Sequence, residues 1–102
     1  MATLTVTVDW PAGTTSPKVD KDEVDVTEKN TKIRWVPGEN VASVDDITGL
    51  PDSEFNSQGP VGKGRYQVND KKDNNGDWKY TVHATNDQNE EGLEDPKIRN
   101  RD

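Results

Sequence analysis

Oxygen-bearing side chains recur at every second position of the segment Asp73-Asn74-Asn75-Gly76-Asp77. Calcium loops begin with this spacing, because a hard cation such as Ca²⁺ or Mg²⁺ binds several oxygens that converge from one tight turn. The later loop positions do not match, since Gly76 comes fourth instead of sixth and Ala84 stands where a bidentate acid is needed. Two interpretations stay open: a Ca²⁺ or Mg²⁺ site at Asp73, Asn75 and Asp77, or a turn in which Asn and Gly satisfy the backbone.

Paired carboxylates form a second group of candidates. They are Asp45-Asp46, Glu90-Glu91 and Glu94-Asp95. Such pairs bind cations, or act as acid and base where their environments split their pKa values. The sequence does not fix the distances between them, and solvated loop charge is the alternative interpretation.

Groups for nucleophilic or redox catalysis are scarce. His83 is the single histidine and there is no cysteine, which excludes disulfides and ordinary zinc or copper sites. The serines lie in no nucleophile-elbow motif, and the glycines at 59, 62 and 64 lack the Gly-Lys-Ser/Thr signature of a phosphate loop. We therefore predict a protein that is not an enzyme, with no catalytic residue and no cofactor beyond the Ca²⁺ or Mg²⁺ considered above.

Three tryptophans suggest a platform on which a sugar could stack. Trp35 and Trp78 alternate with polar neighbours and are expected in the core. Trp10 stands at a strand end before Pro11, where we expect it to be exposed. Trp10 is therefore the candidate binding residue of a carbohydrate-binding module.

Length and charge limit the classes of partner. A chain of 102 residues is one domain, and its net charge of −7 opposes binding to a phosphate backbone. The acidity is compatible with basic protein partners and with cations. No apolar run exceeds two residues and the N-terminus has no leader-like pattern, so we expect no membrane span and a cytoplasmic location. A monomer or a weak homodimer is expected.

The segment that organises these candidates is 77–84. Trp78, Tyr80, Val82 and Ala84 fall on one parity and polar residues on the other, which predicts a central strand with one apolar face. On this strand His83 belongs to the polar, solvent-facing side. The same alternation predicts strands at 2–9, at 24–26 with an edge residue at Val19, at 32–36, at 65–70 and at 96–100.

The connections are predicted from turn residues. Asn75-Gly76 indicates a hairpin connection over 71–76, and 86–95 is expected to be an acidic loop. In 38–64, Val44, Ile47 and Leu50 permit either one short strand or a helical turn, while several Gly and Pro residues disfavour a long helix.

These elements predict an all-β, immunoglobulin-like β-sandwich of about seven strands over residues 1–102, with Trp35 as the buried mid-chain aromatic. The leading functional hypothesis is a non-catalytic binding or protein-interaction module that acts through a strand edge or a loop end. The alternatives are a divalent-cation-binding domain and a carbohydrate-binding module.

Tyr80-Thr81-Val82 and Glu94-Asp95-Pro96-Lys97-Ile98 resemble the DP-EP family of small bacterial proteins, named for Asp-Pro and Glu-Pro motifs. The matching residues cover about the final quarter of the chain. The resemblance implies an immunoglobulin-type sandwich of unknown function and no activity. More loosely, the strand pattern around Trp35 is similar to cupredoxin-like sandwiches, whose copper ligands are absent here.

Overall fold

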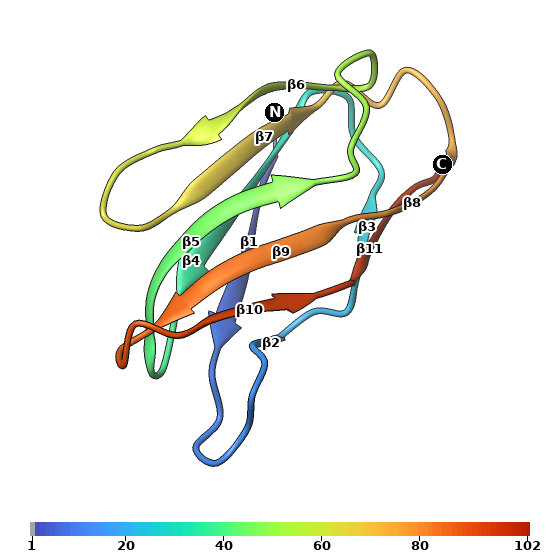
Figure 1. Cartoon of the computed structure of the whole chain (residues 1–102). Helices are drawn as coiled ribbons and strands as arrows, with labels where there is room; N and C mark the ends of the chain where they lie inside the picture. The colour runs from blue at the N-terminus through green and yellow to red at the C-terminus, as the bar shows by residue number, and fades with distance from the viewer. Residues whose placement is uncertain (1) are drawn as a thin grey trace.

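Three β-sheets arranged in two layers make up the structure (Figure 1). The computed structural model describes residues 2–102, and none of them is helical. The first sheet has the strand order β2-β1-β4-β7-β6. Its strands are β1 (Thr3–Asp9), β2 (Lys18–Val19), β4 (Thr31–Pro37), β6 (Phe55–Pro60) and β7 (Tyr66–Asp70).

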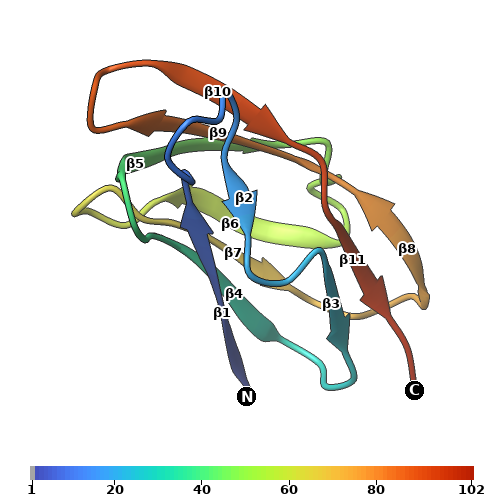
Figure 2. The same ribbon diagram turned by 90° about the horizontal axis from the view of Figure 1, so that it is seen from below.

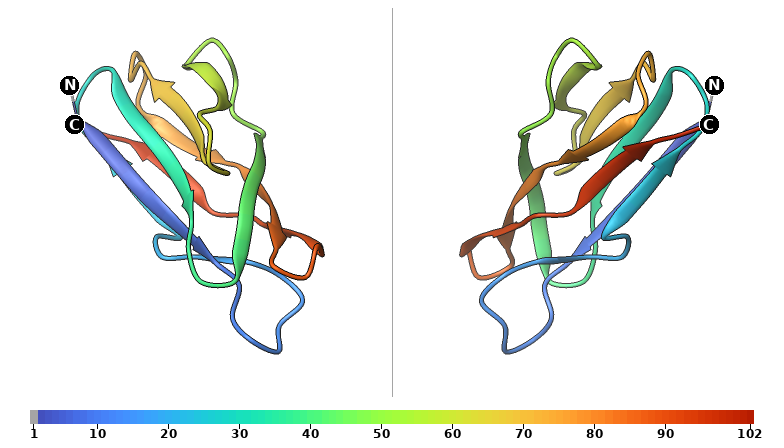
Figure 3. Two further views of the ribbon diagram at one scale, coloured as in Figure 1. Left: turned by 90° about the vertical axis from the view of Figure 1, so that its left-hand side faces the viewer. Right: turned by 90° about the vertical axis from the view of Figure 1, so that its right-hand side faces the viewer.

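The second layer consists of two three-stranded groups that join end to end (Figures 1 and 3). One group has the order β10-β9-β5, with β5 (Val41–Thr48), β9 (Thr81–Asn86) and β10 (Glu91–Glu94). The other has the order β3-β11-β8, with β3 (Glu23–Val26), β8 (Gly76–Lys79) and β11 (Lys97–Asn100). Strand β8 leads into β9 and β10 leads into β11, and Tyr80 N donates to Pro96 O at 3.1 Å across the junction. We call this continuous pair of long strands, 76–86 and 91–100, the ribbon.

The expected all-β fold is confirmed, and a sandwich is compatible with the two layers. Eleven strand segments are present among residues 2–102, where about seven were expected. Two of the pairings are parallel, β1 with β4 and β3 with β11. An immunoglobulin sandwich is built from antiparallel sheets, so these two pairs set this topology apart from the simplest form of that fold.

The strands form where apolar residues alternate with polar ones. Buried and half-buried residues alternate along β4, β7 and β9, as expected for strands with one face on a core. The strands predicted at 2–9, 24–26, 32–36, 65–70 and 96–100 all appear, with ends shifted by a residue or two. The predicted central strand 77–84 is divided at Tyr80 into β8 and β9.

Three predicted connections were wrong. Residues 71–76 do not form a hairpin, because β7 and β8 lie in different sheets and the segment crosses between them. The expected acidic loop 86–95 contains β10, which pairs with β9. Residues 38–64 contain two strands, β5 and β6, and no helical turn. The inward residues of β5 are three apart (Val41, Val44 and Ile47) because two register shifts each insert an extra residue.

The core joins the two layers through Trp35. Trp35 on β4 is fully buried, and its Nε1 donates a hydrogen bond of 3.1 Å to Tyr80 Oη in the ribbon. The two rings also meet edge to face, with centroids 5.3 Å apart. The tyrosine is 2% exposed, and burial raises the pKa of its hydroxyl well above the ordinary value. The Tyr80 hydroxyl therefore stays protonated at physiological pH. It retains its own O–H donor while its oxygen accepts the hydrogen bond from Trp35 Nε1.

We predict that Tyr80→Phe lowers the free energy of unfolding by about 1–3 kcal/mol, because it leaves the buried Trp35 N–H without a partner. Urea denaturation followed by Trp fluorescence measures the change. Tyr66→Phe, at the other tyrosine, is the comparison variant, and we expect a smaller loss because its ring is less deeply buried. Equal stability of Tyr80→Phe and the parent would contradict a structural role for the hydrogen bond.

Candidate functional site

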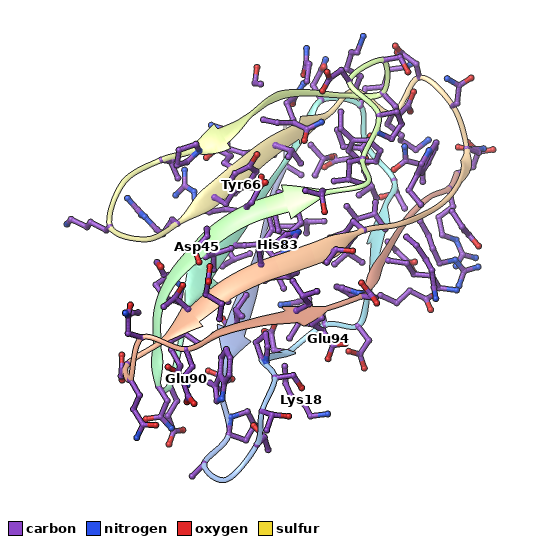
Figure 4. The ribbon with its side chains drawn as sticks, in the orientation of Figure 1. Lys18, Asp45, Tyr66, His83, Glu90 and Glu94 are labelled. Carbon is purple, nitrogen blue, oxygen red and sulfur yellow. The ribbon has the colours of Figure 1, made fainter. Side chains whose placement is uncertain are left out.

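The outer face of β10-β9-β5 brings together polar side chains from three strands. Because Val82 and Ala84 of β9 point into the core, His83 projects outward between them. The strand register places Leu93 of β10 on one side of His83 and Asp46 of β5 on the other. We call the surface formed by Asp45, Asp46, His83, Glu91 and Leu93 the acidic face. Asp45 and His83 of this face are labelled in Figure 4.

The acidic face is hollowed around its one large apolar side chain. A depression of about 380 Å³ is lined by the acidic face together with Ala84 and Gly92. Leu93 is 55% exposed there, and among residues 2–102 only Val61, at 37%, is another large exposed hydrophobic. Leucine in water is unfavourable by the transfer free energy of its exposed apolar surface, so this position favours being covered.

The acids on β5 are held in place by a β-bulge. The register shift between Val44 and Asp46 leaves Asp45 as the extra residue, so Asp45 and Asp46 both point outward. Asp45 accepts hydrogen bonds from Ser43 Oγ at 2.6 Å and from Thr85 Oγ1 at 2.5 Å. Burial, followed by the negative charge of Asp46, raises the pKa of the Tyr66 hydroxyl. The bulge therefore fixes two negative charges beside His83.

A hydroxyl and imidazole pair joins the acidic face to Thr48, at the end of β5. Thr48 Oγ1 lies 2.9 Å from His83 Nε2, a distance suited to proton transfer. A triad also needs an acid that orients the histidine, and among residues 2–102 no hydrogen bond joins His83 Nδ1 to a carboxylate. A half-buried imidazole together with exposed carboxylate and leucine groups in one depression is suited to contacting a partner.

The predicted metal residues each have a different partner. Asp73 lies 3.7 Å from Lys29 and Asp77 lies 3.4 Å from Arg99, and the amide of Asn75 holds the pKa of the Asp102 carboxyl below its ordinary value. Among the described residues, no group of three or more His, Cys, Asp or Glu side chains is placed to hold a metal ion. The carboxylates of Asp73 and Asp77 thus connect this segment to Lys29 and Arg99 of neighbouring elements.

The expected exposure of Trp10 was wrong. Its side chain is 4% exposed, and Nε1 donates to Thr14 O at 3.0 Å. Gly92 of β10 lies against the ring: a Cβ there would be 2.6 Å from Trp10 Cη2 and 2.8 Å from Pro17 Cδ. A ring covered in this way offers no free face for stacking on a sugar. The sequence signal that could have shown this is Gly92, in a segment read as loop.

Trp10 also borders a second depression, of about 240 Å³, at the loop end of the sandwich. It is lined by 10–14, Asn40, 86–88 and Glu90. The side chain of Asn86 holds its own loop, since Oδ1 accepts from Gln88 N and Glu90 N and Nδ2 donates to Glu90 Oε1. Much of the polar lining is therefore occupied by bonds within the loop.

Sequence reasoning missed a buried polar cluster at the opposite end. Glu54, Asp70 and Asn100 are 3%, 0% and 3% exposed, and they link the turn before β6 with β7 and β11 across the two layers. Asn100 Nδ2 donates to Glu54 Oε2 and to Asp70 Oδ1, at 3.0 Å each. Asn74 donates to Glu54 through both its backbone N and its Nδ2, which holds the crossing segment 71–76 in place.

The two buried carboxyls differ in their surroundings. Burial raises the pKa of Asp70, and one of its oxygens, Oδ2, has no hydrogen-bond partner. Burial acts in the same direction on Glu54, but the hydrogen bonds from Asn74 and Asn100 outweigh it and lower its pKa. The negative charge of the cluster is therefore held on Glu54 more readily than on Asp70.

No model of a known protein family matches the chain, and a search among curated proteins gives no match either. None of the described residues forms a helix long and apolar enough to cross a membrane.

We predict that Gly92→Ala destabilises the protein by about 1–3 kcal/mol, because the new methyl group displaces Trp10 or Pro17. Gly59→Ala is the matched control, since a Cβ at that position meets nothing within 4 Å. Chemical denaturation of the two variants, together with the emission maximum of Trp fluorescence, tests the packing. Equal stabilities of the two variants would show that β10 does not press on Trp10.

We predict that the stability of Asp70→Asn relative to the parent rises with pH. The pKa of Asp70 in the folded protein lies above its ordinary value of 3.8. Its protonated form is therefore favoured by folding, and that contribution is fully present below pH 3.8 and is lost as the pH rises through the folded value. The amide remains neutral and supplies an N–H where Oδ2 is unpaired.

Urea unfolding at a series of pH values measures this difference. Asp87→Asn, at an exposed loop position, is the control for loss of one charge, and its difference from the parent is expected to lack the rise. A difference between Asp70→Asn and the parent that stays constant from pH 3 to pH 8 would contradict the expectation.

Proposed function

We propose that this protein is a non-catalytic protein-interaction module that binds a basic partner segment on the acidic face. The proposal rests above all on Leu93, a half-exposed leucine in a depression ringed by carboxylates. An apolar centre with a charged rim is the arrangement by which protein surfaces bind other proteins. A lysine or arginine of the partner would face Asp45, Asp46 or Glu91, while its methylene stem would cover Leu93.

The size of the site supports weak and reversible binding. Complete burial of a leucine contributes about 1.5–3 kcal/mol, and each exposed ion pair adds roughly 0.2–1 kcal/mol. The net charge of −7 also speeds the approach of a basic partner, an effect that salt screens. The acidic face is thus suited to a transient complex whose specificity depends on charge.

The two other functional hypotheses have less support. The Ca²⁺ or Mg²⁺ site would need Asp73, Asn75 and Asp77 to leave their present partners. The carbohydrate site would need Trp10 to be uncovered from beneath Gly92. The acidic face needs no rearrangement before a partner binds.

We also propose that the fold is a variant of the immunoglobulin-like sandwich and that the chain is a relative of the DP-EP family. Two features support this kinship: the two-layer arrangement, and the position of Asp95-Pro96 at the junction of β10 and β11. A cytoplasmic location is a further proposal, supported by the acidic composition and the absence of cysteine.

We predict that a short synthetic peptide of alternating Lys and Val binds the protein, and that Leu93→Ser weakens binding about fivefold to tenfold, as expected for loss of about 1 kcal/mol. Fluorescence anisotropy of the labelled peptide measures the affinity at low and at high salt. Binding should weaken as salt increases.

Val61→Ser is the matched control, because it removes the other large exposed hydrophobic, which does not line the depression around Leu93. A peptide of alternating Glu and Val tests the sign of the charge and is expected not to bind. Absence of binding by the Lys and Val peptide, or an equal loss in Leu93→Ser and Val61→Ser, would overturn the proposed function.

A further inference from the structure

Strand β10 lies at the open end of its row of strands. The group β10-β9-β5 ends in β10 on one side and in β5 on the other. The β5 side is partly covered, since Val44 N donates to Gly64 O at 2.7 Å from the loop after β6. The β10 side has no strand beside it among residues 2–102.

No strand of residues 2–102 lies on the open side of β10 because the segment before β3, which could extend along β10, pairs instead with β1 of the first sheet. Strand β3 pairs with β11 along the same side of the ribbon, and Lys97 N donates to Asp22 O. Continued backwards, β3 would run beside β10, but at Asp20 the chain bonds Thr7 of the first sheet and enters β2. Figure 2 shows β3 beside β11 and the ribbon continuing to β10. The ribbon is therefore covered along its β11 half and open along its β10 half.

The backbone groups at this edge can be assigned from the register. Asn86 N donates to Glu90 O at one end of the β9 and β10 pairing, and Tyr80 N donates to Pro96 O at the other. In an antiparallel pair every second residue bonds the neighbouring strand. Gly92 and Glu94 thus bond β9, and the N–H and C=O groups of Glu91 and Leu93 point toward the open side.

The two faces of β10 differ: its outer face is exposed to solvent, and its inner face packs against the first sheet. Glu91 and Leu93 belong to the acidic face, next to His83 and Thr85 in the adjoining strand. On the inner face Gly92 rests on Trp10 and Pro17. Strand β10 is thereby supported from below, and its outward side chains are available to the cross-strand neighbours of a new strand.

Charge decides which chain can fill the position. Carboxylates dominate along β10 and its flanks: Glu90, Glu91, Glu94 and Asp95, with Lys18 of β2 the lysine labelled near this edge in Figure 4. A second copy of this protein would bring a second set of β10 carboxylates beside the first, and like charges on neighbouring strands repel. An extended basic segment meets no such repulsion.

We propose that the partner binds as an additional β-strand along β10, and that it is a short, extended, lysine- or arginine-rich segment with alternating apolar residues. This inference rests on the proposed function and specifies the form of the partner. The added strand bonds the N–H and C=O groups of Glu91 and Leu93. On the acidic face its lysine or arginine side chains neutralise Glu91 and cover Leu93 with their methylene stems, while its apolar residues lie on the opposite face of the added strand.

Amide hydrogen exchange followed by NMR tests the strand addition, with the Lys and Val peptide as the probe. We expect the amide hydrogens of Glu91 and Leu93 to gain protection at least tenfold when the peptide saturates the protein. Those of Gly92 and Glu94 are internal controls, since they already bond β9 and should change less. The parent protein is used throughout, so no variant has to fold.

Two N-methylated forms of the peptide give a second readout, one methylated on odd residues and the other on even residues. A strand presents alternate N–H groups to its neighbour, so one form should lose binding and the other should keep it. Equal binding by both forms, or an unprotected Leu93 amide in the saturated complex, would overturn strand addition and leave the proposed function standing. Failure of the unmethylated peptide to bind would overturn both.

Discussion

The contact between Trp35 and Tyr80 is the constraint on which the rest of the structure depends. Trp35 lies in the middle of the first sheet, and Tyr80 lies where β8 passes into β9 in the second layer. Their hydrogen bond and edge-to-face rings fix the two layers at one buried point. Because Tyr80 is held there, the ribbon is divided at that point, with β8 and β11 on one side and β9 and β10 on the other. The acidic face belongs to the second half.

Asp95-Pro96 acts on the same junction from the neighbouring strand. Proline has no N–H to donate, which favours an interruption between β10 and β11, while its carbonyl accepts from Tyr80 N. Asp95 accepts a hydrogen bond of 2.8 Å from Thr81 Oγ1, directly after the tyrosine. Two sequence features therefore favour the junction: Tyr80 in one strand and Asp95-Pro96 in the other. A short motif of this kind has a structural explanation before any functional one.

Period-two alternation was sufficient to predict the strands that have one regular buried face, and it also placed His83 on the wet side of β9. It failed where a bulge changes the period: Val41, Val44 and Ile47 are three apart, a spacing that a helix shares. Asn75-Gly76 was misread because a local turn preference does not reveal which sheet receives the next strand. The row Leu93, His83 and Asp46 depends on strand register, which no local pattern in this sequence specifies.

The residues of β10 are constrained in two ways, by the exposure of its edge and by the packing of its inner face. An exposed edge strand tends to pair with other chains, and natural proteins limit this with short strands and charged side chains. Glu91 and Glu94 meet that need, yet Leu93 between them is left half exposed, where a polar residue would protect the edge better. Gly92 cannot be larger without displacing Trp10, so the strand is also fixed from its inner side. An edge with this composition opposes pairing with its own copies through charge, while its one apolar side chain stays uncovered.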